Sequence, residues 1–403
     1  MRNDSPSLIR QLSMRVVAEV LLRDGPVSRA SLARATGLSK QTMSQVIAEL
    51  EKSGLVQAVG VSRGPIGRSA TAFEIIKGAA YALGVDCGGN KTSAAIADLS
   101  GDILAETTEP TDSRGGRQVV DQIRVMAGTL ADRLGIDIAS TRSVVVGTPG
   151  VIDPDSGAVA LVPNIKGLSE FHVARALGER FGQIVTIEND VNLAMLGEVW
   201  LGCASSCENA AFIAIGTGVG LGLISNGKLV RGASGAAGEI AYLPIGEDTT
   251  SRAALDVGAF ELEVGSRGIV RRYHAAGGAA VATVRDIFER LDAGDPIAGS
   301  VLDASARTIG LAITALHALT DPELVVLGGS VGMRPELVQR VQRVMPSLYA
   351  RRVRIAASAL GSRAGLVGAV SSAVHRLHND LFGIPDMPGE LTLPSAKLMR
   401  AAE

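Results

Sequence analysis

Three polar residues in a row, Glu188, Asn189 and Asp190, follow an apolar strand predicted over residues 184–187. A carboxylate at the end of a strand can accept a proton from a substrate hydroxyl, and the Asn189 amide supplies both a donor and an acceptor. Two more carboxylates come later in the chain: Glu239 and Glu261. Such groups fit an uncharged polyol, because each can hold hydroxyl groups through two hydrogen bonds. The alternative for Asp190 is that it only caps the end of its strand.

Two glycine-rich turns, at residues 86–91 and 216–220, each join two predicted strands. Turns of this kind expose backbone N–H groups that can bind phosphate oxygens. Neither turn is specific by itself, but the pair fits a nucleotide-binding cleft. The turns at residues 147–150 and 163–164 follow apolar strands and are predicted to line a cleft, although Asn164 also fits an ordinary turn position.

The elements around these turns occur twice. Residues 81–104 and residues 211–230 each read as strand, glycine turn, strand, tight hairpin and strand, and Asn226-Gly227 is a strong hairpin signal. This repeat predicts a duplicated α/β fold whose two glycine turns face one shared cleft. Helices are predicted at residues 117–134, 301–319 and 364–379. The first of these has a buried stripe and a glycine stop: Val119, Ile123, Met126 and Leu130, then Gly135.

The first 78 residues predict three helices and a β-hairpin. The first helix, residues 7–23, has a row of apolar residues at four-residue spacing: Leu8, Leu12, Val16 and Val20. A short second helix spans about residues 28–35. A third begins after Ser39 as its N-cap and buries one stripe: Met43, Val46, Ile47 and Leu50. A hairpin over residues 56–75 completes the winged helix-turn-helix pattern.

This head predicts binding to double-stranded DNA. The N-terminal end of the third helix would enter the major groove, where Lys and Gln can meet guanine or adenine edges. The wing tip would meet phosphates or a narrow minor groove. The predicted DNA-binding residues are Ser39, Lys40, Gln41, Thr42, Ser44, Gln45, Arg63 and Arg68. Residues 1–78 hold 11 basic and 6 acidic side chains (net +5), whereas the other 325 hold 28 and 35 (net −7). The alternative is a solvated three-helix domain with scattered charges.

Composition narrows the class of protein. With 46% hydrophobic residues, the 403-residue chain is not mostly disordered, and 3% aromatic residues argue against a platform for stacking single-stranded bases. Three cysteines exclude a disulfide framework and a four-cysteine zinc site. Cys203 and Cys207 are expected to be small buried residues near a loop, and no histidine is assigned a role. No apolar run reaches membrane-spanning length and the N-terminus lacks a signal-peptide core, so the cytoplasm is expected.

From Gly84 to about His375 the chain resembles the ROK family (repressors, open reading frames and sugar kinases). The resemblance is carried by GVDCGGNKTSAAIADLSG, GTPGVIDPDSG, PNIKGL, IENDVN, IGTGVGLGLISNGKLVRGASGAAGEI and DPELVVLGGSV. It implies an α/β fold: an N-terminal winged helix-turn-helix followed by a duplicated actin/hexokinase-like (ribonuclease H-like) two-lobed domain. We expect the head at 1–78, the first lobe at 79–198, the second at 199–381 with its final helix returning to the first lobe, and a loosely attached tail at 382–403.

The resemblance also implies roles for residues. Those that would hold a sugar are Asn164, Asn189, Asp190, Glu239 and Glu261, and Asp190 would be the general base in a kinase. Those that would cradle ATP phosphates are Asp86, Gly88, Gly89, Asn90, Thr92, Gly216, Thr217, Gly218 and Gly220. Gly328-Gly329 would lie near the adenosine.

The chain departs from the family pattern in two places. Family members carry a His after the Gly-Glu pair and then a cysteine-rich zinc loop. The corresponding positions here hold Tyr242, Arg252, Ala254 and Ala259. We therefore expect no structural zinc and a loop held by other contacts, with Tyr242 at the place of a sugar-contacting His. Asn90 replaces the Thr that kinases usually have, which weakens the kinase interpretation.

The sequence predicts a sugar-responsive regulator, a repressor of carbohydrate-use genes, with its effector in the interlobe cleft. The expected partners are a double-stranded DNA operator, a small sugar or sugar derivative, and a second copy of the chain in a homodimer or higher homo-oligomer. Closure of the lobes would reorient the heads on a dimer. The alternative is an ATP-dependent sugar kinase with a DNA-binding head. ATP is expected only in that case, and no membrane partner is expected.

Overall fold

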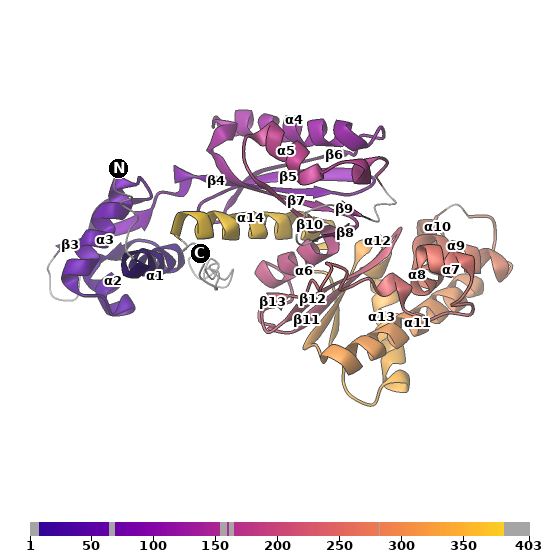
Figure 1. The fold of residues 1–403 in the computed structure, drawn as a ribbon. Coiled ribbons are helices and arrows are strands. Elements are labelled where there is room, and N and C mark those ends of the chain that lie inside the picture. Colours follow the sequence, from indigo (N-terminus) through magenta and orange to yellow (C-terminus); the bar gives the residue numbers. More distant parts are fainter. Residues whose placement is uncertain (1–7, 64–68, 154–158, 161–164, 282, 383–403) are drawn as a thin grey trace. The chain divides into compact units, whose positions relative to one another are not determined.

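The computed structural model describes residues 8–63, 69–153, 159–160, 165–281 and 283–382 (Figure 1). The chain divides into two compact units. Unit 1 holds Met1–Gly147, Asn164–Ile187 and Ala369–Glu403, and unit 2 holds Thr148–Pro163 and Glu188–Gly368. Unit 2 thus includes residues 148–163 and 188–198, which the sequence analysis placed in the first lobe. The predicted C-terminal tail lies outside the described residues, apart from Phe382.

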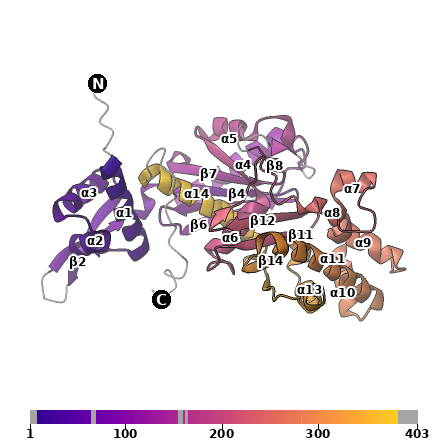
Figure 2. The same cartoon turned by 60° about the horizontal axis from the view of Figure 1, so that its bottom comes forward.

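The head is a three-helix domain with a small sheet, as predicted. Its helices, gathered together in Figure 2, are α1 (Leu8–Asp24), α2 (Arg29–Thr36) and α3 (Lys40–Lys52). Its strands are β1 (Val27–Ser28), β2 (Val56–Arg63) and β3 (Ser69–Ile75), in the order β1-β3-β2. All four residues of the predicted α3 stripe are buried. The short strand β1 pairs with β3 and was not predicted from the sequence.

The predicted inner row of α1 is wrong at two positions. Leu12 and Val16 are 36% and 37% exposed, and the buried residues of this helix include Val17, Val20 and Leu21. An α-helix turns about 100° per residue, so each four-residue step drifts about 40° around the axis and such a row leaves the contact face. The face that α1 buries is set by its contacts with α2, α3 and β3.

Unit 1 also contains a five-stranded sheet of order β10-β7-β4-β5-β6. The strands are β4 (Tyr81–Cys87), β5 (Lys91–Asp98), β6 (Ile103–Pro110), β7 (Thr141–Thr148) and β10 (Val185–Asn189). Helices α4 (Gly116–Leu134) and α5 (Val173–Phe181) lie on one face of the sheet, and α14 (Ala364–Phe382) lies on the other (Figure 1). The predicted stripe of α4 is buried and Gly135 ends the helix in the left-handed region. Close approach of α14 requires Gly84, whose added Cβ would lie 2.4 Å from the Val370 amide nitrogen.

Unit 2 is built on a sheet of order β13-β12-β11-β14-β15. These strands are β11 (Ala210–Ile215), β12 (Val219–Ser225), β13 (Lys228–Leu229), β14 (Leu324–Gly328) and β15 (Ile355–Ala357). A short ribbon is formed by β8 (Val151–Ile152) and β9 (Val159–Ala160). In each large sheet the repeated meander is antiparallel and its first strand pairs in parallel with a later one, β4 with β7 and β11 with β14. This confirms the predicted duplication.

The helices of unit 2 form two apolar cores, one on each face of its sheet. Helix α6 packs with β11 and β12 on one face. The helices of this unit are α6 (Asp190–Trp200), α7 (Arg252–Val257), α8 (Ala259–Val264), α9 (Ser266–Ala275), α10 (Val284–Asp292), α11 (Pro296–Thr320), α12 (Gly329–Gly332) and α13 (Pro335–Leu348). Among the described residues, no helix combines the length and apolar character needed to span a membrane.

Candidate functional site

Strand β10 runs directly into α6, and this junction carries Asn189 and Asp190. The Asn189 side chain is the N-cap: its Oδ1 accepts hydrogen bonds from the amides of Val191 (2.9 Å) and Asn192 (3.1 Å). Its Nδ2 donates to the Gly150 carbonyl at 3.0 Å, which ties the 147–150 turn to the junction. The capping role considered for Asp190 therefore belongs mainly to Asn189. Asp190 accepts one bond from the Val191 amide and lies half-buried in the first helical turn.

The three predicted sugar-binding carboxylates lie within unit 2 and influence one another. Desolvation raises the pKa of Asp190. Glu239 is exposed, yet desolvation by surrounding protein atoms raises the pKa of its carboxyl group. The Asp190 charge raises this pKa further. Desolvation also raises the pKa of Glu261; the Val219 amide opposes this shift and the Glu239 charge adds to it. The structure thus brings Asp190, Glu239 and Glu261 into one electrostatic neighbourhood, suited to groups that bring hydrogen-bond donors.

Hydrogen bonds within the second glycine turn and from Ser266 hold it in place. The Gly216 amide donates to the Gly218 carbonyl at 2.9 Å, and the amide and hydroxyl of Ser266 donate to the Gly216 carbonyl. Glu261 Oε2 accepts from the Val219 amide at 2.9 Å, and a Cβ on Gly218 would lie 3.2 Å from that oxygen. Glu261 therefore joins the carboxylate cluster to this turn. The amides of Gly216 and Val219 already have acceptors, so a phosphate would rely on the other amides of the turn.

In the first glycine turn the predicted residues have different environments. Thr92 is fully buried, and its hydroxyl shares a 3.0 Å hydrogen bond with that of Thr111. The Gly88 amide donates to the Lys91 carbonyl at 3.0 Å. Gly89 and Asn90 are exposed, whereas Asp86 is half-buried. Thr92 therefore packs beneath the turn. Of the predicted phosphate-binding residues in this first turn, Gly89 and Asn90 are exposed to solvent.

The residues at the family's zinc positions do not fit zinc. Tyr242 is 45% exposed, Arg252 pairs with Asp256 at 3.0 Å, and Ala254 and Ala259 are small buried residues. No cluster of three or more metal-ligating side chains occurs in the part of the chain that the structure describes.

Capping and close backbone packing hold this loop. Ser251 caps α7 by accepting from the Ala254 amide at 3.2 Å. Gly258 has φ +103°, and its added Cβ would lie 2.3 Å from the Ala241 carbonyl oxygen. Capping and packing contacts therefore shape this loop.

Cys207 is buried and Cys203 is half-buried in the turn after α6, as expected, but Cys203 also has a carboxylate partner. Its thiol donates to the fully buried Glu198 at 3.2 Å. Glu198 also accepts from the Cys203 amide (2.9 Å), the Leu360 amide (3.1 Å) and the Ser358 hydroxyl (2.5 Å). Burial and then the Glu198 charge raise the pKa of the Cys203 thiol to about 12. No sequence pattern predicted this cluster, because Ser358 and Leu360 lie about 160 residues from Glu198.

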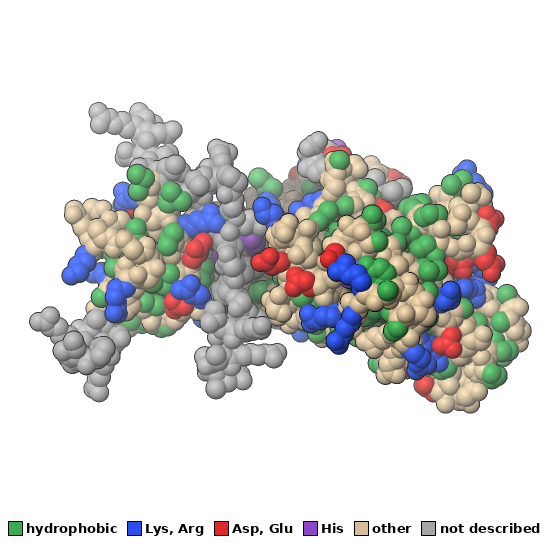
Figure 3. Space-filling model, turned by 90° about the horizontal axis from the view of Figure 1, so that it is seen from below, with side chains coloured by type: hydrophobic (Ala, Val, Ile, Leu, Met, Phe, Trp, Pro, Cys, Tyr) green, Lys and Arg blue, Asp and Glu red, His purple; other side chains and the backbone are tan. Residues whose placement is uncertain are grey.

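Helix α3, the predicted DNA-recognition helix, has an exposed N-terminal end. Ser39 is the N-cap and accepts from the Thr42 amide at 3.1 Å. The side chains of the next turn and a half that face solvent are Lys40, Gln41, Ser44 and Gln45. Lys and Arg side chains of the head stand at its surface (Figure 3). Arg10 pairs with Glu49 and Arg29 with Glu51, whereas Lys40 makes no ion pair with the described residues.

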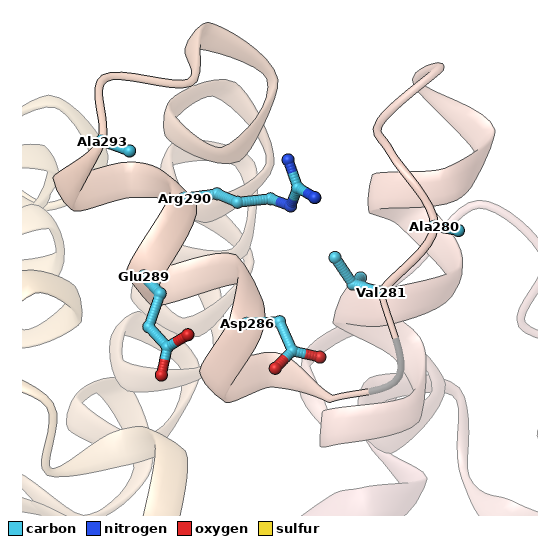
Figure 4. Close-up of a pocket in the computed structure, with 6 residues that line it drawn as sticks. All are labelled: Ala280, Val281, Asp286, Glu289, Arg290 and Ala293. Atoms are coloured by element: carbon cyan, nitrogen blue, oxygen red, sulfur yellow. The ribbon is translucent and has the colours of Figure 1, made fainter.

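Three predicted residues cannot be placed. Asn164 and Arg68 lie outside the described residues, as does the side chain of Arg63, whose backbone ends β2. An open pocket of about 390 Å³ in unit 2 contains none of the predicted residues. Figure 4 shows Arg290 of α10 extending across it toward Val281.

Comparisons with known proteins agree with this organisation. The ROK family model matches residues 82–376, and the MarR family model matches residues 12–63. A putative xylose repressor from Caldicellulosiruptor sp. (strain Rt8B.4) is 25% identical over 94% of this chain and 98% of its own length. A glucokinase from Halalkalibacterium halodurans is 31% identical over 71% of this chain and 92% of its own.

A solved structure described as a ROK family transcriptional regulator, a homologue of the Escherichia coli MLC protein, has the same fold. Its TM-score is 0.73 at 21% identity, covering 93% of this chain and 98% of the other. The similarity therefore extends through the head as well as the body.

Proposed function

The chain belongs to the ROK family, and from that membership we propose that it is a sugar-responsive DNA-binding regulator that represses carbohydrate-use genes. Its relative from Caldicellulosiruptor is named a putative xylose repressor and aligns over head and body alike. We propose for this chain the same class of activity, repression through DNA binding, with a sugar or sugar derivative as its effector.

The observation that carries the proposal is the exposed first turn of α3. Lys40, Gln41 and Gln45 are exposed beside the capped N-terminus of this helix, where a winged helix-turn-helix reads the major groove. Lys40 makes no ion pair with the described residues and is available to DNA. In this proposal Ser39, Thr42 and Ser44 contact the phosphates or base edges of the same groove, and Arg63 and Arg68 contact the flanking DNA.

The effector site of the proposal is the carboxylate cluster of unit 2. Asp190, Glu239 and Glu261 accept hydrogen bonds from sugar hydroxyls, which suits a neutral or amino sugar better than an anionic one. Asn189 and Asn164 add amide groups, and Tyr242, 45% exposed, contributes an aromatic face. The protein acts as a homodimer or higher homo-oligomer on a palindromic operator, in the cytoplasm where that DNA lies.

The proposed regulator works without a structural zinc and without turning over ATP. Tyr242, Arg252, Ala254 and Ala259 are not zinc ligands, and capping and packing contacts hold their loop. Elemental analysis of the purified protein tests this, and stoichiometric zinc would contradict it.

A shift assay on the protein's own promoter region tests the regulator. D-Xylose, D-glucose and N-acetyl-D-glucosamine are each titrated into the protein–DNA complex at several salt concentrations. We expect salt-dependent binding and release by one sugar. Binding that none of the sugars changes would contradict the sensing half of the proposal, and absence of specific binding would contradict the DNA half.

The second candidate is an ATP-dependent sugar kinase with a DNA-binding head. Similarity to a glucokinase and the half-buried Asp190 beside other carboxylates favour it. In that reaction Asp190 would be the general base, and the turns at residues 86–92 and 216–220 would hold phosphates. A coupled ADP-release assay with the same sugars decides between the two. Turnover that is lost in Asp190→Asn would establish the kinase.

A further inference from the structure

An ion pair between Arg231 and Glu188 joins two segments of unit 2 that are far apart in sequence. Glu188 lies in β10 immediately before Asn189 and Asp190, and Arg231 lies in the loop after β13. The Arg231 Nε lies 2.8 Å from Glu188 Oε2, and a terminal guanidinium nitrogen lies 2.7 Å from the same oxygen. Two charge-assisted contacts to one oxygen fix the direction of the Arg231 side chain.

Glu188 is a rigid anchor for this pair. Its side chain is only 10% exposed, and its Oε1 accepts from the Asn189 amide and from Asn192 Nδ2, both at 3.0 Å. The carboxylate is therefore held in place by the same junction of β10 and α6 that carries Asp190. Arg231, by contrast, is 53% exposed, so its position depends on this contact more than on packing.

The other end of the Arg231 loop carries Glu239. The Arg231 carbonyl accepts from the Ala237 amide at 3.1 Å, which closes the loop on itself. The Gly238 carbonyl accepts a hydrogen bond from the Leu221 amide of β12 at 3.0 Å, and Glu239 is the next residue in the chain. The Asp190 charge acts on Glu239, so the loop brings together two carboxylates that repel each other. The Arg231–Glu188 ion pair ties the start of this loop to the strand end that carries Asp190.

We propose that Arg231 is a positioning residue for the sugar site, which holds the loop carrying Glu239 against the strand end carrying Asp190. The effect of Arg231 on sugar binding rests on the proposed function. Its effect on the position of the loop does not. The carboxylates act on the sugar and Arg231 acts through them, because its guanidinium is engaged with Glu188.

The geometric part is tested without any sugar, on the full chain. Hydrogen–deuterium exchange of residues 231–239 is compared between wild type, Arg231→Met and Arg231→Lys. We expect exchange at least about tenfold faster in Arg231→Met, with Lys restoring part of the protection because it keeps the charge. The control is Arg252→Met, which breaks the exposed Arg252–Asp256 pair in the same unit. Unchanged exchange of residues 231–239 in Arg231→Met overturns the proposal.

The functional part uses whichever of D-xylose, D-glucose and N-acetyl-D-glucosamine releases DNA from wild type. The half-maximal concentration should rise at least about tenfold in Arg231→Met, rise less in Arg231→Lys, and stay unchanged in Arg252→Met. Faster exchange with an unchanged half-maximal concentration shows a purely structural pair and also overturns the proposal. If no sugar acts on wild type, the sensing function fails, and the exchange experiment still decides whether Arg231 holds the loop.

Discussion

His378 in α14 makes the stability of unit 1 depend on pH. The side chain is fully buried, and its Nε2 lies 2.7 Å from the Leu99 carbonyl, so this nitrogen carries the proton. The Leu99 amide in turn donates to the carbonyl of Lys77, in the short η1 helix (Lys77–Ala79) that follows the head. Burial, with a smaller effect of His375, lowers the pKa of His378 from 6.5 to about 4. Replacing it by Gln removes the titration and keeps a side-chain N–H donor.

The magnitude follows from the difference between the folded and unfolded pKa values. Between pH 6.5 and about 4 the unfolded chain binds a proton at His378 that the folded chain does not. Above pH 6.5 the neutral His378 makes its full contribution to the free energy of unfolding. This contribution is lost as the pH falls toward 4. At about 1.4 kcal/mol per pKa unit, wild type should lose about 1 kcal/mol near pH 5.5 and about 3 kcal/mol near pH 4, relative to His378→Gln.

Two measurements check this. The chain has five histidines, so the ring Cε1–H resonances can be followed by NMR and that of His378 identified from the His378→Gln spectrum. Urea unfolding of both proteins between about pH 7.5 and 4.5 gives the difference in the free energy of unfolding. The same substitution at the exposed His274 is the control. A His378 resonance that titrates near 6.5, or a stability difference that does not change with pH, would refute the reasoning.

Three further outcomes are expected. Lys40→Ala should weaken DNA binding on every sequence and lower the slope of log affinity against log salt by about one. Lys52→Ala, at the other end of α3, is the matched control, and equal slopes would contradict a role at the N-terminal end. Gly238→Ala places a Cβ 2.1 Å from the Leu221 carbonyl oxygen at φ +99° and should cost about 3 kcal/mol or more in thermal denaturation. Gly277→Ala, at φ +82° with no atom within 4 Å, should cost only about 1 kcal/mol, and similar losses would argue against the contact. Glu198→Gln should lower the pKa of Cys203 from about 12 and speed its reaction with a thiol reagent at alkaline pH; an unchanged rate would show that burial alone sets that pKa.

The sequence predicted what depends on neighbours within one element or one repeat. The buried stripe of α3, its Ser39 cap and the Gly135 stop of α4 follow from helical periodicity and local hydrogen bonding, and the structure confirms them. The duplicated meanders follow from two similar strings of strands and turns. The site was predicted as a set of residue types, of which the structure groups Asp190, Glu239 and Glu261.

The contacts that the sequence did not predict join residues that lie far apart in the chain. Arg231 meets Glu188 from 43 residues away, and Ser358 meets Glu198 from 160 away. No local pattern marks such pairs, because their partners are chosen by how sheets and helices stack. The α1 row failed for a related reason: Leu12 and Val16 have suitable spacing, but the neighbouring elements decide which side of the helix is covered.

The path of the chain between the units has a consequence during synthesis on the ribosome. The head, complete by about Ile75, leaves the ribosome before the two large sheets. The first large sheet waits for α14, which is made after all of its strands and covers that sheet's second face. A growing chain therefore presents a finished winged-helix head while the body is still incomplete, and an interrupted translation product ending before residue 364 would leave the second face of this sheet uncovered.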